Sequence, residues 1–546
     1  MKQTTAIIIT SIDDANLTIK FDSKKKIALD YSIILSSKED SIDYFFENTP
    51  KGLSNLPAML AKSWYRDSDN IDNHNNRYSV GLVLEKRICY MISNIIKFYY
   101  SFLHLSKKYN KIEIPNNYPD FLKGVVDIFS EQVISIAPQM YSPDLSVSIE
   151  KRCLITKVNI NKYSKYFRLI QKPFIQILKN RTMVFPDWTY SKQRNNNYIY
   201  QNQLNIFNSF YYKETHKSPN KIMSPPINIY AIKDILSNFK INDTDSNNLV
   251  TLVTKIIHEE FRNSINAIEH QYNTMMELVD YYKPSKIIVP DDAQYPWFNM
   301  LMQITTRLKI ETITVVDGYP MYLDIDHVKI KEDGVTPLVD KYATMGTLNH
   351  DMHGKAYPGF RRLFICPPIL SHLTNIKKSK LQYDFLIMMS IPNLFNPDSR
   401  WDMRNKYIID IVNLLTLKGK PKIAVKVKPG TNLSDTKWLE NYFIKNNLNN
   451  IDFLRGKGAQ AISSSKNIIG QLGTSAYEAL IIGRPYYIYE PLDCALADFT
   501  ISNSIVDSCY IAREIEKLSV NILNKNNVNI TTEKLIDGPE MSERII

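Results

Sequence analysis

Residues 461–491, AISSSKNIIGQLGTSAYEALIIGRPYYIYEP, contain the pattern that decides the fold. Apolar runs at 467–469 and 486–489 predict two short strands, and the segment between them predicts a helix over 475–482. Two such strands joined by a helix form a β-α-β unit, because parallel strands need a crossover connection. This stretch therefore predicts a parallel sheet covered by helices.

The same alternation of strand and helix precedes this stretch. Strands are predicted at 385–389, 422–428 and 451–454, and helices are predicted at 404–417 and 434–445. Residues 381–546 are therefore expected to form a doubly wound α/β domain.

A second unit of this kind lies upstream, within residues 241–380. Helical spacing from Leu249 to Val279 is followed by a predicted strand at 286–289, a helix over 293–308 and a strand at 312–316. We therefore expect two doubly wound, Rossmann-like α/β domains that face each other across a cleft, with a Pro- and Lys-rich linker at 366–382.

Residues 1–240 differ in composition from the rest. Of the 16 glycines in the chain, 13 lie from Gly318 onward, so sharp turns concentrate in the second half. The sequence of residues 1–240 predicts a helix-rich extension on the acceptor side, with short strands at 26–35 and 182–185.

Residues 88–105 form the longest apolar stretch of this extension. Lys97 and His104 interrupt it, and about 20 mostly apolar residues are needed to span a membrane. It predicts a buried amphipathic helix, and the alternative is a helix lying on a membrane face.

Composition and charge limit the class of protein. The chain has 546 residues, 44% hydrophobic and 23% charged, which is typical of a folded protein of two or three domains. A net charge of +11 favours an anionic partner, although an evenly solvated lysine-rich surface would give the same value. Five cysteines without a CxxC pair, and an apolar run of only 6–9 near the N-terminus, predict a cytoplasmic protein.

Candidate phosphate-binding residues cluster in the last predicted domain. Lys426 and Lys428 end a strand, and Thr474 and Ser475 open a helix whose unpaired N–H groups suit an anion. Glu478, one turn into that helix, suits the hydroxyls of a ribose. Ser475 and Glu478 also match a capping box, which needs no ligand.

Candidate acid/base residues lie in the earlier domain. Asp291 and Asp292 follow one predicted strand and Asp317 follows the next, so each could act as a base at the sheet edge. The first two could equally cap the following helix, and Asp317 with Gly318 could be only a turn. His327 and His353 lie in the same region, where a lone histidine is more often structural.

These stretches resemble the GT-B-fold glycosyltransferases that build bacterial surface polysaccharides. The donor half is similar at AVKVKPG (424–430) and at 461–491, and the acceptor half at KIIVPDDAQYPWF (286–298) and TITVVDGYPMYLD (312–324). The resemblance covers about residues 250–500, and its motifs are moderately specific.

Within that family the motifs are similar to the branch that resembles sialyltransferases and uses CMP-activated acidic sugars. Asp317 matches its acidic-acidic-glycine motif, with Val316 in place of one acid, and Lys426 with Lys428 matches its Lys-x-His-Pro motif, with Lys428 in place of His. Ser463, Ser464 and Ser465 match its serine-rich motif. The two replacements leave the base and the donor open.

The resemblance implies an inverting glycosyltransferase without a metal or other cofactor, in capsule or lipopolysaccharide assembly. Its donor would be a nucleotide-sugar, either a CMP-activated acidic sugar or a nucleotide-activated hexose. Its acceptor would be a glycan or glycolipid at the cytoplasmic face of the inner membrane. The alternatives are a nucleotide-sugar epimerase of the same fold, a CDP-polyol phosphotransferase, and a basic protein that binds nucleic acid or a membrane surface. Nucleic acid is not an expected partner, because the charges look dispersed.

Overall fold

The computed structural model describes part of the chain, and the features below refer to that part. The described residues are 3–9, 25–28, 53, 56–65, 73–74, 78–115, 122–136, 157–160, 182–184, 204–205, 210–213, 225, 227–289, 296–315, 339–356, 359, 361–365, 372–376, 379–389, 404–417, 419–427, 433–456, 458–471, 473–490, 507–530 and 533–538.

The C-terminal part of the chain is built on a six-stranded parallel sheet, which we call the second sheet. Across the sheet the order is β17-β16-β15-β18-β19-β20. The strand that comes third in the chain thus lies at one edge, followed by the second, first, fourth, fifth and sixth. The strands are β15 (Tyr383–Met388), β16 (Ile423–Lys426), β17 (Ile451–Leu454), β18 (Ser465–Gly470), β19 (Tyr486–Tyr489) and β20 (Ile511–Ala512).

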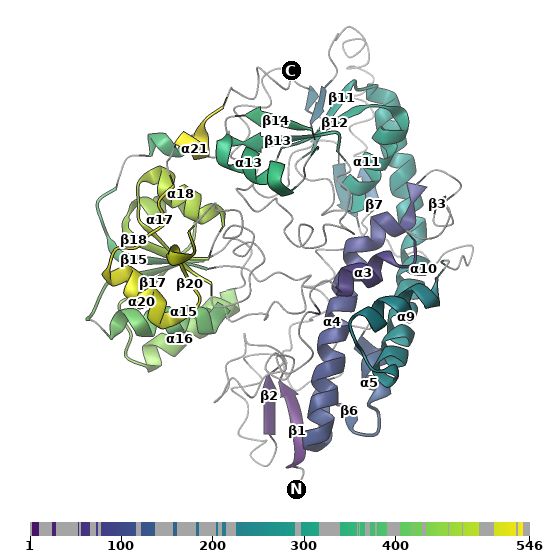
Figure 1. Ribbon diagram of the computed structural model, residues 1–546, viewed down its shortest axis with the longest axis horizontal. Helices are drawn as coiled ribbons and strands as arrows, with labels where there is room; N and C mark the ends of the chain where they lie inside the picture. The colour runs from purple at the N-terminus through teal and green to yellow at the C-terminus, as the bar shows by residue number, and fades with distance from the viewer. Residues whose placement is uncertain are drawn as a thin grey trace.

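Helices cover both faces of the second sheet, as Figure 1 shows. One core contains side chains of α15 (Arg404–Thr416), α16 (Leu433–Lys445) and α20 (Ile515–Leu523). Another contains side chains of α17 (Gly458–Ser463) and α18 (Thr474–Ile482). All residues of β16 and β19 are buried, which explains why these strands read as continuous apolar runs.

The middle of the chain forms another six-stranded parallel sheet, the first sheet, in the order β14-β13-β12-β11-β8-β9. Its strands are β8 (Thr182–Val184), β9 (Leu204–Asn205), β11 (Lys286–Val289), β12 (Glu311–Val315), β13 (Lys341–Met345) and β14 (Arg362–Ile365), with helices α11 (Pro296–Leu308) and α13 (Gly346–Ala356). Because β8 and β9 precede residue 240, this sheet draws strands from both sides of the expected domain boundary.

The N-terminal part contains a third parallel sheet, which the sequence pattern did not predict. Its order is β2-β1-β5-β6, from β1 (Gln3–Ile9), β2 (Lys25–Ala28), β5 (Tyr109–Pro115) and β6 (Val133–Ile136). More of the described residues of this extension lie in helices than in strands, so the helix-rich expectation stands and the parallel sheet is an addition to it.

Helices pack together beside this third sheet in one large core. They are α3 (Leu56–Lys62), α4 (Val80–Lys108), α5 (Lys123–Ile128), α9 (Ile229–Asn238) and α10 (Asp243–Tyr282). Most described side chains of α4 are buried, so the prediction of a buried helix over 88–105 is confirmed and a helix lying on a membrane face is excluded. Among the described residues, no helix is long and apolar enough to span a bilayer.

Polar contacts fix the long helix α10 against α4. The Asn242 side chain caps α10 by accepting from the Asp245 N–H at 2.9 Å, and the Asp245 carboxylate accepts from the Tyr99 hydroxyl of α4 at 2.7 Å. Arg87 of α4 also forms an ion pair with Glu260 of α10. These bonds satisfy polar groups that would otherwise be costly to bury.

Short elements complete the description. β3 (Asn73–His74) pairs antiparallel with β4 (Tyr78–Ser79), and β7 (Lys157–Ile160) pairs antiparallel with β10 (Phe210–Lys213). Two 3₁₀ turns are η6 (His372–Asn375), which lies in the expected linker, and η7 (Ser508–Tyr510).

The C-terminal segment returns to the first sheet, where α21 (Glu533–Ile536) packs on α13 (Figure 1). The Asp537 carboxylate accepts from the Thr347 N–H at 2.7 Å and also bonds the Thr347 hydroxyl. Gly346 allows this approach: its φ is +66°, and a Cβ there would lie 2.6 Å from the Leu535 carbonyl oxygen. The chain thus links its two six-stranded sheets a second time, and the expected α/β fold with two doubly wound sheets is confirmed.

Candidate functional site

The strand order of the second sheet marks where a ligand would bind. The chain order reverses between β15 and β18, and ligands of open parallel sheets bind beyond the carboxyl ends of the strands at such a point. We call this side the carboxyl edge and the opposite side, where the strands begin, the amino edge. Lys426 ends β16 at the carboxyl edge, and α18 begins there, just after β18.

Lys426 lies deeper than the sequence suggested. Its side chain is 5% exposed, and its Nζ donates to the Val427 carbonyl oxygen at 2.7 Å. Burial lowers the pKa of Lys426, the Glu478 carboxylate opposes this shift, and the Arg455 guanidinium adds to it. The ammonium has three donors, of which the Val427 carbonyl takes one.

Glu478 approaches Lys426 from α18. It is buried at 6% exposure, and a Cβ at Gly458, the first residue of α17, would lie 3.6 Å from its Oε2 atom. The structure thus buries the side chains of both Lys426 and Glu478 at the sheet edge. Opposite charges held together in a dry setting interact more strongly than in water.

Arg455 is a member of this group that the sequence analysis missed. It follows β17 at the carboxyl edge, is exposed, and donates through Nη2 to the Thr436 hydroxyl at 2.5 Å. The signal was present as Arg-Gly-Lys-Gly at 455–458, because Gly456 adopts a φ of +104° in the turn that leads to α17.

The start of α18 contradicts the capping-box interpretation. Gly473 is the N-cap residue, and no side chain caps the helix. Ser475 lies inside the first turn and its hydroxyl contacts the Tyr486 hydroxyl at 3.1 Å, while that tyrosine donates to the Gln471 carbonyl oxygen at 2.7 Å. Thr474 and Ser475 therefore stand where the sequence placed them, at a helix start on the carboxyl edge.

Ser463 and Ser464 lie at the other side of the sheet. Ser463 ends α17 and Ser464 follows it immediately before β18, and the Ser464 carbonyl oxygen accepts from the Gln382 N–H at 2.8 Å at the amino edge. Their hydroxyls bond the Gln460 and Ala461 carbonyl oxygens at 3.0 and 3.1 Å. The structure does not bring these serines to Lys426 and Ser475, so we leave them out of the site.

A buried polar pair borders the carboxyl edge on the far side of α18. Gln471 Nε2 donates to Glu490 Oε2 at 3.1 Å, and Glu490, which follows β19, is 1% exposed. Nothing in the sequence pattern distinguished Glu490 from an ordinary strand end.

The first sheet has its own reversal of chain order, between β8 and β11. Asp291 and Asp292 come directly after β11 in the sequence, and Asp317 follows β12. These three carboxylates, together with Lys428 and His327, lie outside the described residues.

His353 on α13 is described and buried at 3% exposure. Its ring lies 4.6 Å from the Tyr342 ring, centroid to centroid, and burial beside Arg362 and His350 lowers its pKa to about 4. A neutral, packed imidazole supports the structural interpretation of this histidine. Among the described residues, no group of three or more His, Cys, Asp or Glu side chains could hold a metal.

Comparisons with known proteins give weak likeness. No protein-family model and no curated protein matches the sequence. Among solved structures, UDP-GlcNAc 2-epimerase from Methanocaldococcus jannaschii, in complex with UDP-GlcNAc and UDP, is 14% identical over 51% of this chain and 79% of its own, with a TM-score of 0.33. The enzyme from Neisseria meningitidis bound to UDP-GlcNAc is 11% identical over 54% and 80%, with a TM-score of 0.32.

A synthase is also among the similar structures. Sucrose-phosphate synthase from Thermosynechococcus elongatus is 9% identical over 48% of this chain and 69% of its own, with a TM-score of 0.29. With TM-scores this low, the fold assignment rests on the order and direction of the strands in the chain itself.

Proposed function

We propose that this protein is an inverting glycosyltransferase of GT-B-like architecture that binds a nucleotide-sugar at the carboxyl edge of the second sheet. The observation that carries the proposal is the meeting of Lys426, Glu478 and the start of α18 at the point where strand order reverses. This arrangement offers both a cation and a carboxylate next to an uncapped helix start.

Each group suits one part of a nucleotide-sugar. Lys426 and Arg455 supply positive charge for the leaving phosphate, and the N–H groups that open α18 at Thr474 and Ser475 add partial positive charge. Glu478 suits the ribose, because a carboxylate accepts hydrogen bonds from its hydroxyls. Lys428 follows two residues after Lys426 in the sequence and would extend the positive charge.

The proposed chemistry is a single displacement. A carboxylate of Asp291, Asp292 or Asp317 takes the proton of the acceptor hydroxyl as that hydroxyl attacks the anomeric carbon, and the bond to the nucleotide phosphate breaks. Cations fixed beside the leaving group stabilise the charge that develops there, without a metal or other cofactor. The CMP-linked acidic sugar remains our proposed donor, with a glycan or glycolipid acceptor of capsule or lipopolysaccharide assembly at the cytoplasmic face of the inner membrane.

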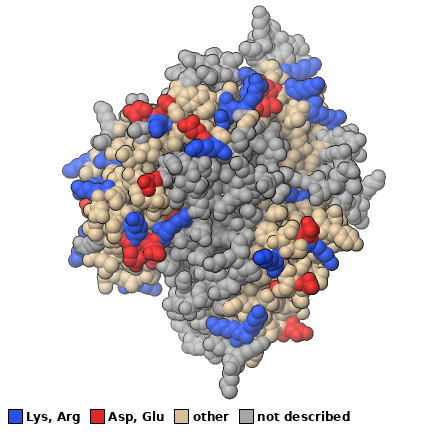
Figure 2. All heavy atoms as spheres, in the orientation of Figure 1, with Lys and Arg blue, Asp and Glu red and all other residues tan. Residues whose placement is uncertain are grey.

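The face of the molecule shown in Figure 2 does not have the charge distribution of a nucleic-acid surface. On the face shown in Figure 2, Lys and Arg side chains alternate with Asp and Glu side chains over the described residues. A nucleic-acid surface needs a continuous basic stripe.

The test is a set of thermal unfolding measurements with CMP-, UDP-, GDP- and CDP-linked sugars. We expect one nucleotide class to raise Tm by mass action, since a ligand of the native state stabilises it. Adding candidate acceptors should then release free nucleotide. If the protein epimerises the nucleotide-sugar in the absence of an acceptor, the proposed activity is epimerisation and not transfer. If Tm stays unchanged with every donor, the nucleotide site is refuted.

A further inference from the structure

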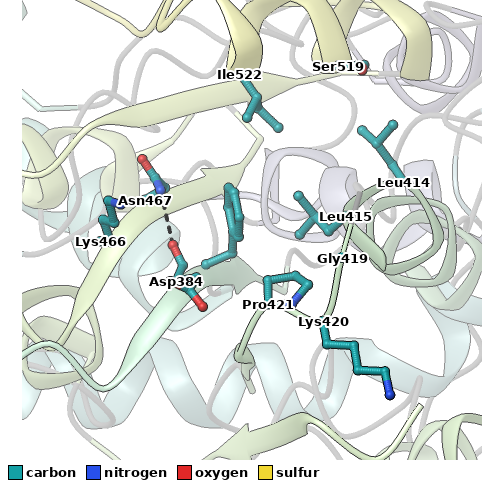
Figure 3. A pocket seen from close by; sticks show the side chains of 11 residues that line it. Asp384, Leu414, Leu415, Gly419, Lys420, Pro421, Lys466, Asn467, Ser519 and Ile522 are labelled. Atoms are coloured by element: carbon teal, nitrogen blue, oxygen red, sulfur yellow. Dashed lines mark hydrogen bonds between the residues drawn. The ribbon is translucent and has the colours of Figure 1, made fainter. Parts of the chain in front are cut away.

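The amino edge of the second sheet, opposite the proposed nucleotide site, carries a surface that the proposed chemistry does not use. A cavity of about 450 Å³ opens there between α15 and α20. Phe385 at the start of β15 lines it together with Leu414, Leu415 and Ile522, and Figure 3 shows these last three side chains around the hollow.

Large aliphatic side chains protrude around this cavity. Leu417, directly after α15, is 83% exposed, and Leu523, at the end of α20, is 63% exposed. Leu381 and Val520 are 49% and 45% exposed. Four such side chains at one sheet edge exceed the scattered exposure that needs no explanation.

Lysines surround these aliphatic side chains. The exposed lysines of this edge are Lys380, Lys420, Lys422, Lys466 and Lys525. Lys420 and Lys466 line the cavity itself, and Lys420 extends away from its apolar side chains (Figure 3). We call the four aliphatic residues and these five lysines the basic apolar face.

Nearby carboxylates of the described residues are already engaged. Asp384 Oδ2 accepts from the Lys422 N–H at 2.9 Å, and Asp452 shares a hydrogen bond with the Tyr383 hydroxyl. The Lys422 ammonium lies over the Tyr383 ring, 5.0 Å from its centroid. The five lysines outnumber these two carboxylates, so the charge summed over these residues is positive.

We propose that the basic apolar face docks on an anionic lipid bilayer. Its aliphatic side chains would enter the boundary between head groups and acyl chains, while the lysine ammonium groups meet lipid phosphates. Lysine suits this position because its long apolar stem lies along the acyl layer while its charge stays in water.

Composition favours a bilayer over a protein partner. Protein interfaces are depleted in lysine and enriched in aromatic residues and arginine, whereas this face combines lysines with aliphatic side chains. Docking at the amino edge also leaves the carboxyl edge turned away from the bilayer, where a nucleotide can enter from solution. The proposal names the surface for the membrane contact proposed above, but it does not depend on the nucleotide site.

The experiment is sedimentation of the full chain with vesicles of phosphatidylcholine alone and of phosphatidylcholine mixed with phosphatidylglycerol. We expect binding to the anionic vesicles only, and release at high salt because the lysine contribution is screened. Two double variants, Lys420→Glu with Lys466→Glu and Leu417→Ser with Leu523→Ser, should each weaken binding by about tenfold or more. All four substituted side chains are exposed, so their melting curves should match the wild type.

A matched control lies on α9 in the other half of the chain. Tyr230 is 85% exposed and Lys233, one turn later, is also exposed, so Tyr230→Ser with Lys233→Glu changes an apolar group and a charge away from this face. This variant should bind vesicles as the wild type does.

Three results would overturn the docking proposal. These are equal binding to neutral and anionic vesicles, unchanged binding in both double variants of the face, and self-association without vesicles that the leucine variant abolishes. The last would assign the face to a second copy of the chain. The Tm shift with a nucleotide-sugar is measured separately, so failure of either proposal leaves the other testable.

Discussion

The two six-stranded sheets share parallel pairing and helical cover, yet they reverse chain order at different strands. In the second sheet the reversal lies between β15 and β18, beside a buried cation and carboxylate. In the first sheet it lies between β8 and β11, whereas the neutral, buried histidine of this half, His353 on α13, packs on Tyr342 of β13, away from the reversal. Similar backbones thus carry different chemistry, because the residues at the strand ends differ.

The candidate bases follow strands of the first sheet in the sequence, so the proposed chemistry assigns proton transfer to the first sheet and phosphate binding to the second. The largest expected effect is on turnover. Replacing the base by Asn should lower turnover by about 100- to 10,000-fold, the usual contribution of a general base, while donor binding persists.

Asp291→Asn, Asp292→Asn and Asp317→Asn identify the base among three candidates. Turnover with the donor that raises Tm is the measurement. A helix cap tolerates Asn nearly as well as Asp, so a residue that only caps should show little change. Full activity in all three variants would rule out single displacement by these carboxylates.

The second effect sharpens the contrast through pH. The pKa of His353 is lowered to about 4 in the folded chain, so the unfolded chain binds the proton first as pH falls. The contribution of His353 to the free energy of unfolding is therefore fully present above about pH 6.5. It is lost as the pH falls toward 4, and the loss is about 3 kcal/mol. The buried tyrosines Tyr477, Tyr486 and Tyr489 of the second sheet and its helices have raised pKa values because of burial, and they stay neutral over this range.

Hydrogen exchange in urea at both ends of that pH range measures this effect by segment. His353→Gln should reduce the acid-induced loss of protection in β13 and α13, and leave that of β18 and β19 unchanged. The same pH dependence in wild type and variant would remove His353 as the cause.

The smallest effect concerns backbone packing in the second sheet. A Cβ at Gly470 would collide with the Tyr486 hydroxyl and lie 3.0 Å from the Met388 Cβ, so Gly470→Ala should destabilise this sheet by about 1 to 3 kcal/mol. Gly473 is the control, because a Cβ there meets nothing within 4 Å. Urea unfolding that gives equal midpoints for the two variants would contradict the close packing of β15, β18 and β19.

The sequence predicted best where burial produced unbroken apolar runs. The strands expected at 286–289 and 486–489 coincide with β11 and β19, and the helix expected over 475–482 coincides with α18 apart from one residue. The third sheet escaped prediction because its pairs join distant segments: β1 pairs with β5, about a hundred residues later. Local periodicity carries no information about such pairing.

The sheet edge at which each candidate residue lies follows from its place before or after a strand. Lys426 follows a strand and Ser475 opens the helix after another, so both had to lie at the carboxyl edge of a parallel sheet. Ser463 and Ser464 precede β18, and the same rule places them at the amino edge. Arg455 directly follows the strand predicted at 451–454, and it was missed because the glycine-containing turn at 455–458 was not connected with the site.

A stability control must accompany any binding test of this site. Lys426 and Glu478 are both buried, and removing one partner leaves the other charge uncompensated. The double variant Lys426→Met with Glu478→Gln removes both charges and should unfold closer to the wild type than either single variant. If Lys426 and Glu478 only stabilise the fold, the double variant should bind nucleotide again. If they contact the nucleotide, binding should stay weak in the double variant.

Isothermal titration of the stabilising nucleotide into wild type, Glu478→Gln and this double variant tests the central claim most directly. Loss of a hydrogen bond to a charged group weakens binding by about 10- to 150-fold, and we predict at least this loss in both variants. Asp384→Asn, at the amino edge, should bind as the wild type does. Wild-type affinity in Glu478→Gln and in the double variant would contradict a nucleotide site at the carboxyl edge of the second sheet.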